Sequence, residues 1–123
     1  MQRPAAAHLD DSLSILLIVP TFPPDQCGVG DYTFHLATNL HAQGHRVAVL
    51  STRRESQSAA VPFTFLPRLA SWHFPDMRDI LEVVREQAPQ VVHIQYHNED
   101  YESVEMISTL PLCLQEAHPG TTV

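Results

Sequence analysis

Two glycines, Gly28 and Gly30, flank Val29 at the start of a segment with helical periodicity. An apolar segment and a proline-rich loop precede them, so the order is strand, loop and helix. In this order the free N–H groups of the first helical turn and the helix dipole favour an anion, above all phosphate. Glycine also lets a ligand approach the backbone closely. Two interpretations follow: the glycines bind phosphate, or they only permit the turn.

A second group of polar residues follows another predicted strand, Gln90–Gln95. The predicted polar loop Tyr96–Glu102 carries four consecutive hydrogen-bonding side chains: His97, Asn98, Glu99 and Asp100. Polar groups directly after a buried strand lie at the edge of a crevice, where they suit a hydroxyl-rich ligand. The alternative is an ordinary solvated loop.

The histidines do not predict a metal site. If the strand continued to His97, about 13 Å would separate it from His93, which is too far for one ion. We therefore expect His93 to be a hydrogen-bonded core histidine and no metal to bind. Cys27 precedes the predicted helix and is expected to fill a tight turn, and a disulfide with Cys113 is not expected in a reducing compartment.

Known nucleotide motifs are incomplete in this sequence. Thr33 stands where a dinucleotide fingerprint has its third glycine, and Ser51 and Thr52 stand where its acidic residue belongs. The chain has no lysine, which excludes a Walker A loop. NAD binding and P-loop chemistry are therefore not expected.

Composition indicates one globular domain. The 123 residues carry a net charge of −7, and the only basic side chains besides histidine are seven arginines, which argues against a nucleic-acid footprint or an electrostatic membrane anchor. The longest apolar run is far shorter than the ~20 residues of a membrane span. Residues 1–12 lack the apolar core of a secretory signal, so we expect a disordered or irregular lead-in and a cytoplasmic protein.

The hydrophobic pattern predicts an α/β fold with a mostly parallel sheet. The expected strands are 14–20, 46–51, 63–66 and 90–95, and the expected helices are 29–43, 76–87 and 104–118. Thr121–Val123 reads as the start of a fifth strand. In such sheets, ligands bind outside the carboxyl ends of the strands, where the glycine loop and the second polar loop should meet.

Local signals add more detailed expectations. Gly44 should cap the first helix in a left-handed conformation, Asp76 should cap the second, and Pro111 should kink or split the third. The segment Pro67–Pro75 is expected to be irregular. The expected inward-facing residues of the three helices are Val29, Tyr32, Leu36, Ala37 and Leu40; Met77, Ile80, Leu81 and Val84; and Val104, Ile107, Leu110 and Leu114.

The aromatic run Trp72, His73 and Phe74 has two interpretations. It could form a platform for a sugar ring, or it could plug the core under the loop, which we favour.

Taken together, these motifs resemble a known family. The stretch ILLIVPTFPPDQCGVGDYTFHLATNLHAQGHRVAVLSTR is similar to the opening of a group 1 (family 4) glycosyltransferase, QVVHIQYHNEDY resembles its fourth-strand segment, and PLCLQEAHPGTTV resembles the approach to its next strand. The resemblance covers residues 13–123. It implies a partial N-terminal, Rossmann-like domain with helices on both faces of its sheet, the acceptor-side half of a GT-B fold, truncated after the start of the fifth strand.

The resemblance also implies a function. Such enzymes transfer a sugar, of hexosyltransferase type here, from a nucleotide-sugar donor to a glycan, lipid or small-molecule acceptor with retention of configuration. No metal or other cofactor is implied, the nucleotide-sugar being a co-substrate. The positions that match the family's donor-diphosphate loop are Gly28, Val29 and Gly30. Those that match its acceptor side are Asp31, Tyr32, Gln95, His97, Asn98 and Glu99.

The family's donor-binding domain and its acidic E-x7-E motif do not occur in this sequence. No catalytic residue is therefore assigned here, and the isolated chain is expected to be inactive. Two other interpretations stay open: a non-catalytic binding module for a phosphorylated or glycosylated ligand, and a partner subunit that completes its sheet on another chain.

Overall fold

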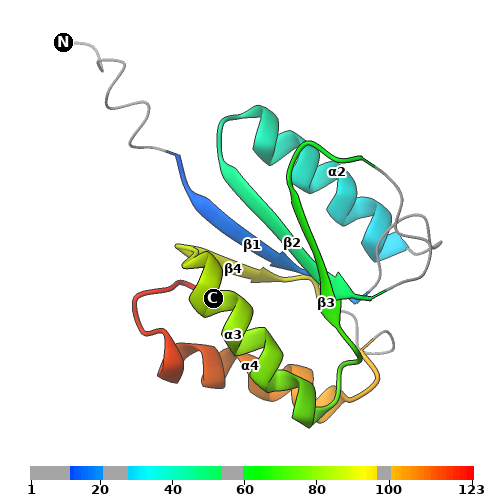
Figure 1. Cartoon of the computed structure of the whole chain (residues 1–123), viewed down its shortest axis with the longest axis vertical. Helices are drawn as coiled ribbons and strands as arrows, with labels where there is room; N and C mark the ends of the chain where they lie inside the picture. The colour runs from blue at the N-terminus through cyan, green and yellow to red at the C-terminus, as the bar shows by residue number, and fades with distance from the viewer. Residues whose placement is uncertain (1–11, 21–27, 54–59, 97–100) are drawn as a thin grey trace.

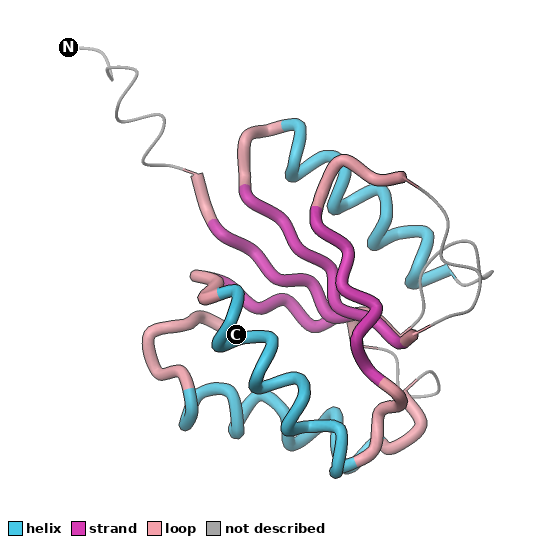
Figure 2. Tube along the Cα trace, in the orientation of Figure 1, coloured by secondary structure: helices cyan, strands magenta, loops and turns pink. Residues whose placement is uncertain are grey.

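The computed structural model is a three-layer α/β arrangement, described for residues 12–20, 28–53, 60–96 and 101–123. Four parallel strands form one sheet in the order β3-β2-β1-β4. Helix α2 covers one face, and α3 and α4 cover the other (Figures 1 and 2). This confirms the predicted Rossmann-like fold with helices on both faces.

The central strand β1 (Ser14–Ile18) has no exposed residue, as its continuous apolar run predicted. It pairs with β2 (Arg46–Thr52) on one side and with β4 (Val91–Ile94) on the other. The register places Ile18 beside Leu50 and beside Ile94. The carboxyl ends of these three strands therefore lie level with one another.

Side chains of the sheet alternate between two cores. Leu17 and Val49 face α2, and they share a cluster with Val19, Ala37 and Phe63. The next residues along the same strands face the opposite layer. There Ile18 and Leu50 pack with Ile80, Val84 and Leu110 of α3 and α4. This parity decides which side chains can meet at the edge of the sheet.

Helix α2 spans Gly28–Ala42, and Gly44 follows it with φ = 97°, which confirms the predicted left-handed cap. Its buried positions are Gly30, Thr33 and Ala37. The prediction that Tyr32 faces inward was wrong, because 60% of that residue is exposed. The small Thr33 occupies the buried position, where its hydroxyl donates to the carbonyl of Val29 across 2.7 Å.

Strand β3 (Thr64–Leu69) is longer than the predicted strand 63–66 and continues through Pro67, which was expected to be irregular. A proline is tolerated because β3 is an edge strand, whose outer side needs no N–H donor. The pairing with β2 shifts register between Ser51 and Thr52. The edge strand therefore follows β2 to the carboxyl end of the sheet.

The helix predicted at 76–87 is preceded by a short 3-10 turn, η1 (Phe74–Asp76), so α3 spans Met77–Gln87. Asp76 does not cap α3 with its side chain. Its carboxylate instead accepts from the backbone N–H of His73 at 3.1 Å and from the Ser71 hydroxyl. Val83 is buried although the prediction omitted it, whereas Leu81 is only partly buried.

Helix α4 spans Val104–Ala117 without a break, so Pro111 does not split it. The Ser103 hydroxyl caps its first turn by accepting from the N–H of Met106 at 3.2 Å. Val104 was predicted to face inward but is 44% exposed, and Met106 is buried instead. The inward stripe is thus formed by Met106, Ile107, Leu110 and Leu114.

Residues Thr121–Val123 begin to pair with β4, as the sequence predicted. Thr122 forms a parallel bridge with Val91. Its carbonyl accepts from Val92 N–H at 2.7 Å, and its N–H donates to the Gln90 carbonyl at 2.9 Å. The segment therefore adopts the position of a fifth parallel strand beside β4.

Candidate functional site at the carboxyl edge of the sheet

The first turn of α2 lies against the carboxyl edge of the sheet, as the strand-loop-helix pattern predicted (Figure 1). Val29 packs against the cluster that contains Val19, the residue that follows β1. The free N–H groups of this turn and the positive end of the helix dipole are therefore next to the ends of β1, β2 and β4. This is the edge where ligands bind in open parallel sheets.

The three residues of the glycine motif have different surroundings. Gly28 is exposed, Val29 is half-buried and Gly30 is buried. A Cβ atom on Gly28 would meet nothing within 4 Å. Contacts among the described residues therefore do not require glycine at this position.

The other predicted site residues on α2 point away from the sheet. Asp31 and Tyr32 are both exposed on the first turns of the helix. They share the ligand edge with the glycine motif, but neither contributes to the buried surface. His97, Asn98 and Glu99 lie outside the residues that the structure describes, as does Cys27.

Gln95 is the predicted site residue whose contacts the structure defines most fully. It follows β4 directly, its backbone N–H donates to the Ile18 carbonyl at 2.8 Å, and it is only 8% exposed. Its side-chain oxygen Oε1 is 3.1 Å from His93 Nε2. Its amide nitrogen Nε2 is buried and has no hydrogen-bond partner among the described residues.

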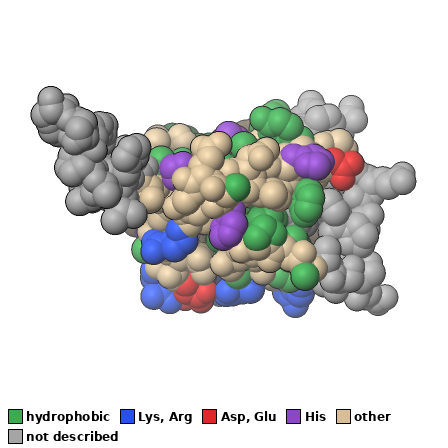
Figure 3. Space-filling model, turned by 90° about the horizontal axis from the view of Figure 1, so that it is seen from above, with side chains coloured by type: hydrophobic (Ala, Val, Ile, Leu, Met, Phe, Trp, Pro, Cys, Tyr) green, Lys and Arg blue, Asp and Glu red, His purple; other side chains and the backbone are tan. Residues whose placement is uncertain are grey.

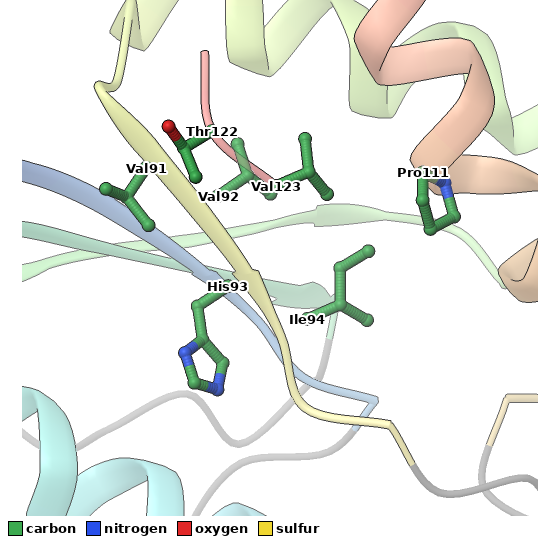
Figure 4. Close-up of a pocket in the computed structure, with 7 residues that line it drawn as sticks. All are labelled: Val91, Val92, His93, Ile94, Pro111, Thr122 and Val123. Carbon is green, nitrogen blue, oxygen red and sulfur yellow. The ribbon is translucent and has the colours of Figure 1, made fainter.

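His93 was predicted to be a core histidine, and this was wrong. It is hydrogen-bonded, through Gln95, but the residue is exposed. Figure 4 shows the cause: His93 points away from Ile94 and Pro111, toward the α2 side of β4. Because β4 lies at the margin of the sheet and α2 lies over its centre, α2 does not cover His93, which is exposed.

Ser51 is a buried polar residue that sequence reasoning noted only as the absence of an acid. It lies at the carboxyl end of β2, 1% of it is exposed, and its hydroxyl has no partner among the described residues. A hydroxyl that ends an otherwise apolar strand was a signal available in the sequence. Its burial depends on the tertiary structure.

Two aromatic residues support this edge from the opposite face. Tyr101 was assigned to a polar loop but is fully buried, and its hydroxyl lies 2.6 Å from the Gln95 carbonyl oxygen and 3.2 Å from that of Ile18. Trp72 is also buried, which confirms the core-plug interpretation for this residue, and its ring meets Tyr101 edge to face at 4.9 Å. His73 and Phe74 are exposed and do not join the plug.

Trp72 also contacts the end of β1. Its indole N–H donates to the Pro20 carbonyl at 3.4 Å, and its backbone N–H donates to the Glu102 carboxylate at 3.0 Å. Glu102 lies 3.5 Å from the imidazole of His73. The ends of β1 and β4 are thus attached to the same aromatic pair.

The described pockets lie elsewhere. A cavity of about 440 Å³ runs along the outer edge of β4 between Pro111 and Val123 (Figure 4). A smaller cavity of about 290 Å³ lies at the amino end of the sheet and is lined by His41, His45 and Arg46. Neither cavity contains a residue of the predicted donor or acceptor site.

On the face viewed over α2, histidines are scattered among uncharged atoms, and the arginines lie toward one margin (Figure 3). Within the described ranges, no three His, Cys, Asp or Glu side chains are grouped so that they could hold a metal ion.

The described helices are also all too short or too polar to cross a bilayer.

Comparison with known proteins decides the family. Residues 27–102, more than half of the chain, match the model of Glycosyltransferase Family 4. The chain belongs to this family. The match includes the whole of α2, the strands β2, β3 and β4, and Gln95. The family assignment and the carboxyl-edge site therefore concern the same part of the molecule. A search of curated proteins finds no match.

Proposed function

We propose that this chain is the acceptor-side, N-terminal part of a retaining glycosyltransferase that uses a nucleotide-sugar donor. The proposal rests chiefly on the family match over residues 27–102, which includes a glycine-led helix at the ligand edge of the sheet. The first turn of α2 supplies N–H groups for the donor diphosphate. The acceptor lies nearer to β4, beside Gln95 and the polar residues that follow it.

In this proposal the chain binds rather than catalyses on its own. The described part is a single Rossmann-like unit, and sugar transfer needs a second domain to hold the nucleotide and stabilise the leaving diphosphate. The purified 123-residue chain is expected to show no turnover. Sugar transfer by this polypeptide to any acceptor would refute the statement.

Inorganic pyrophosphate tests the assigned donor loop without requiring the natural substrate. In ¹⁵N–¹H spectra of the labelled chain, pyrophosphate should shift the backbone amide signals of Gly28, Val29 and Gly30 in a saturable manner. The amide of Gly120, which lies in the turn after α4, is the internal control and should not move. An unchanged set of signals from the glycine motif would contradict the proposed donor loop.

A second candidate function is that of a partner subunit whose sheet is completed by another chain. Among the described residues, the outer edge of β4 pairs with this chain at a single bridge, Thr122 to Val91, so the rest of that edge could accept a strand from a second chain. Size-exclusion chromatography with light scattering distinguishes the two functions. A monomer at all concentrations argues against the partner function, and a stable oligomer supports it.

A further inference from the structure

The cavity of about 290 Å³ lies at the amino end of the sheet, opposite to the candidate site. The last turn of α2 and the first residues of β2 and β3 meet at this end (Figure 1). The polar side chains that line the cavity are those of His41, His45, Arg46 and Thr64. No carboxylate is among the described lining residues, although the whole chain carries a net charge of −7. Arg46 therefore gives the cavity a positive charge that its described lining does not neutralise.

Arg46 is the first residue of β2, and its side chain is oriented by a neutral partner. Its Nη2 donates to the hydroxyl of the buried Ser14 at 3.0 Å, which holds the guanidinium in place and leaves its charge uncompensated. In the part of the chain that the structure describes, Arg46 has no ion pair, whereas Arg68 and Arg85 each pair with a glutamate of α3. A guanidinium has five N–H donors, so most of those of Arg46 remain available.

His45 adds a second donor, and the backbone of Leu13 decides which nitrogen carries it. The Leu13 N–H donates to His45 Nδ1 at 3.0 Å, so Nδ1 is the acceptor nitrogen of the ring and has no proton. The proton of the neutral imidazole is then on Nε2, which is a hydrogen-bond donor. No described residue accepts a hydrogen bond from this Nε2–H, so it is available to a ligand in the cavity.

The backbone acceptors next to the cavity already have donors. The His41 carbonyl accepts from Gly44 N–H at 3.0 Å, and the Leu40 carbonyl accepts from His45 N–H at 3.2 Å. The Gly44 carbonyl accepts from the Ser12 hydroxyl at 3.1 Å. The carboxyl end of a helix disfavours an anion, and these bonds weaken that effect because the terminal carbonyls are paired. The unused hydrogen-bonding capacity of the cavity is therefore mainly that of donors.

We infer that this cavity binds a small organic oxyanion, a carboxylate or a phosphate ester, through the Arg46 guanidinium and the His45 Nε2–H. The guanidinium fork matches the paired oxygens of either group. Val47, Pro62 and Phe63 supply an apolar wall for the body of the ligand. The volume is close to the lower limit of ligand pockets, roughly 300 Å³, so the ligand must be small. The site contains no residue of the proposed donor or acceptor site and goes beyond the proposed function.

The backbone amides of Gly44, His45 and Arg46 report on the cavity in ¹⁵N–¹H spectra of the labelled chain. Benzoate and phenyl phosphate are the anionic probes, and benzamide, which has the shape of benzoate without its charge, is the neutral control. At least one anion should shift the three signals saturably, whereas benzamide should leave them unchanged. The anion with the lower Kd shows whether the cavity prefers a carboxylate or a phosphate ester.

Two arginine variants form a matched pair. Arg46→Gln should weaken binding of the active anion about ten- to hundredfold, because a charge-assisted hydrogen bond is lost. Arg78→Gln makes the same change of charge at an exposed position of α3 that does not line the cavity, and it should leave the Kd unchanged. His45→Asn should weaken binding about three- to tenfold, since asparagine can still accept from Leu13 N–H but lacks the imidazole Nε2–H. Melting temperatures establish that each variant is folded. If Arg46→Gln does not fold, Arg46→Lys keeps the charge without the fork and should weaken binding at least about threefold.

Two outcomes overturn the inference. One is that neither anion shifts the Gly44, His45 and Arg46 signals saturably, or that benzamide shifts them equally. The other is that a folded Arg46 variant binds the anion as tightly as Arg78→Gln does. Either result can occur while pyrophosphate still shifts the Gly28–Gly30 amides, in which case the proposed function stands and only the amino-end cavity fails as a site.

Discussion

The phenol hydroxyl of Tyr101 lies 2.6 Å from the carbonyl oxygen of Gln95, to which it donates a hydrogen bond. Gln95 follows β4, and Tyr101 comes just before α4, so this bond connects the end of a strand to the helix layer beneath it. The same hydroxyl is 3.2 Å from the Ile18 carbonyl. A single buried hydroxyl therefore links the ends of the two strands that carry the candidate site.

Tyr101→Phe should destabilise the protein by about 1–2 kcal/mol, because it removes the hydroxyl and leaves buried carbonyl oxygens with one donor fewer. The ring itself is retained, so its edge-to-face contact with Trp72 should survive. Chemical denaturation monitored by Trp72 fluorescence measures the change. Tyr32→Phe is the control, since Tyr32 is 60% exposed, and it should be neutral. Equal stabilities of the two variants would show that the Tyr101 hydroxyl contributes nothing.

Gly44→Ala should destabilise by about 1–2 kcal/mol for a purely conformational reason. Gly44 has φ = 97°, and among the described residues a Cβ there would approach only the Ser12 hydroxyl oxygen, at 4.0 Å. The cost therefore comes from the left-handed backbone, not from a clash. Gly120→Ala is the matched substitution, with open space and no left-handed φ, and it should be neutral or slightly stabilising. Thermal denaturation of both variants tests the contrast.

Pro111→Ala should stabilise the protein by about 1–3 kcal/mol, since proline inside a helix lacks an N–H donor and alanine is the best helix former. Pro111 is partly buried and lines the cavity beside β4, so the loss of its ring contacts will offset part of this gain. Thermal melting and the helical circular dichroism signal measure the result. A lower melting temperature would mean that the ring contacts outweigh the helix propensity.

The ion pair between Glu82 and Arg85 on α3 should give a small acid dependence. The hydrogen bond from Arg85 lowers the pKa of Glu82 in the folded protein. A lowered folded-state pKa adds stability above the unfolded-state pKa, and this stability is lost as pH falls through the folded-state value. Melting temperatures between neutral pH and pH 3 should fall slightly less steeply in Glu82→Gln than in the parent. The difference should shrink at high salt because both side chains are exposed.

Sequence alone determined the order of the elements and the place of the ligand edge. The apolar run at Ser14–Ile18, the helical period of Gly28–Ala42 and the cap at Gly44 are local patterns, and each predicts its own element whatever lies around it. Parallel strands joined by crossover helices then place the glycine motif at the carboxyl edge. The predicted fold class was confirmed because it depends on this order of elements and not on the packing of individual side chains.

Only the tertiary structure decided which side chains are buried at that edge. Tyr101 has polar neighbours in the sequence and was assigned to a loop, yet it is buried in the core beneath β1 and β4, where its ring contacts Trp72. His93 has apolar neighbours and was assigned to the core, yet it faces the uncovered part of β4. The placement of Ser51 and Gln95 on either side of Val19 likewise cannot be derived from the sequence, because it depends on the register of three strands that are distant along the chain. Whether a residue is buried depends on the helices, strands and loops that pack over it, and its neighbours in the sequence do not specify those elements.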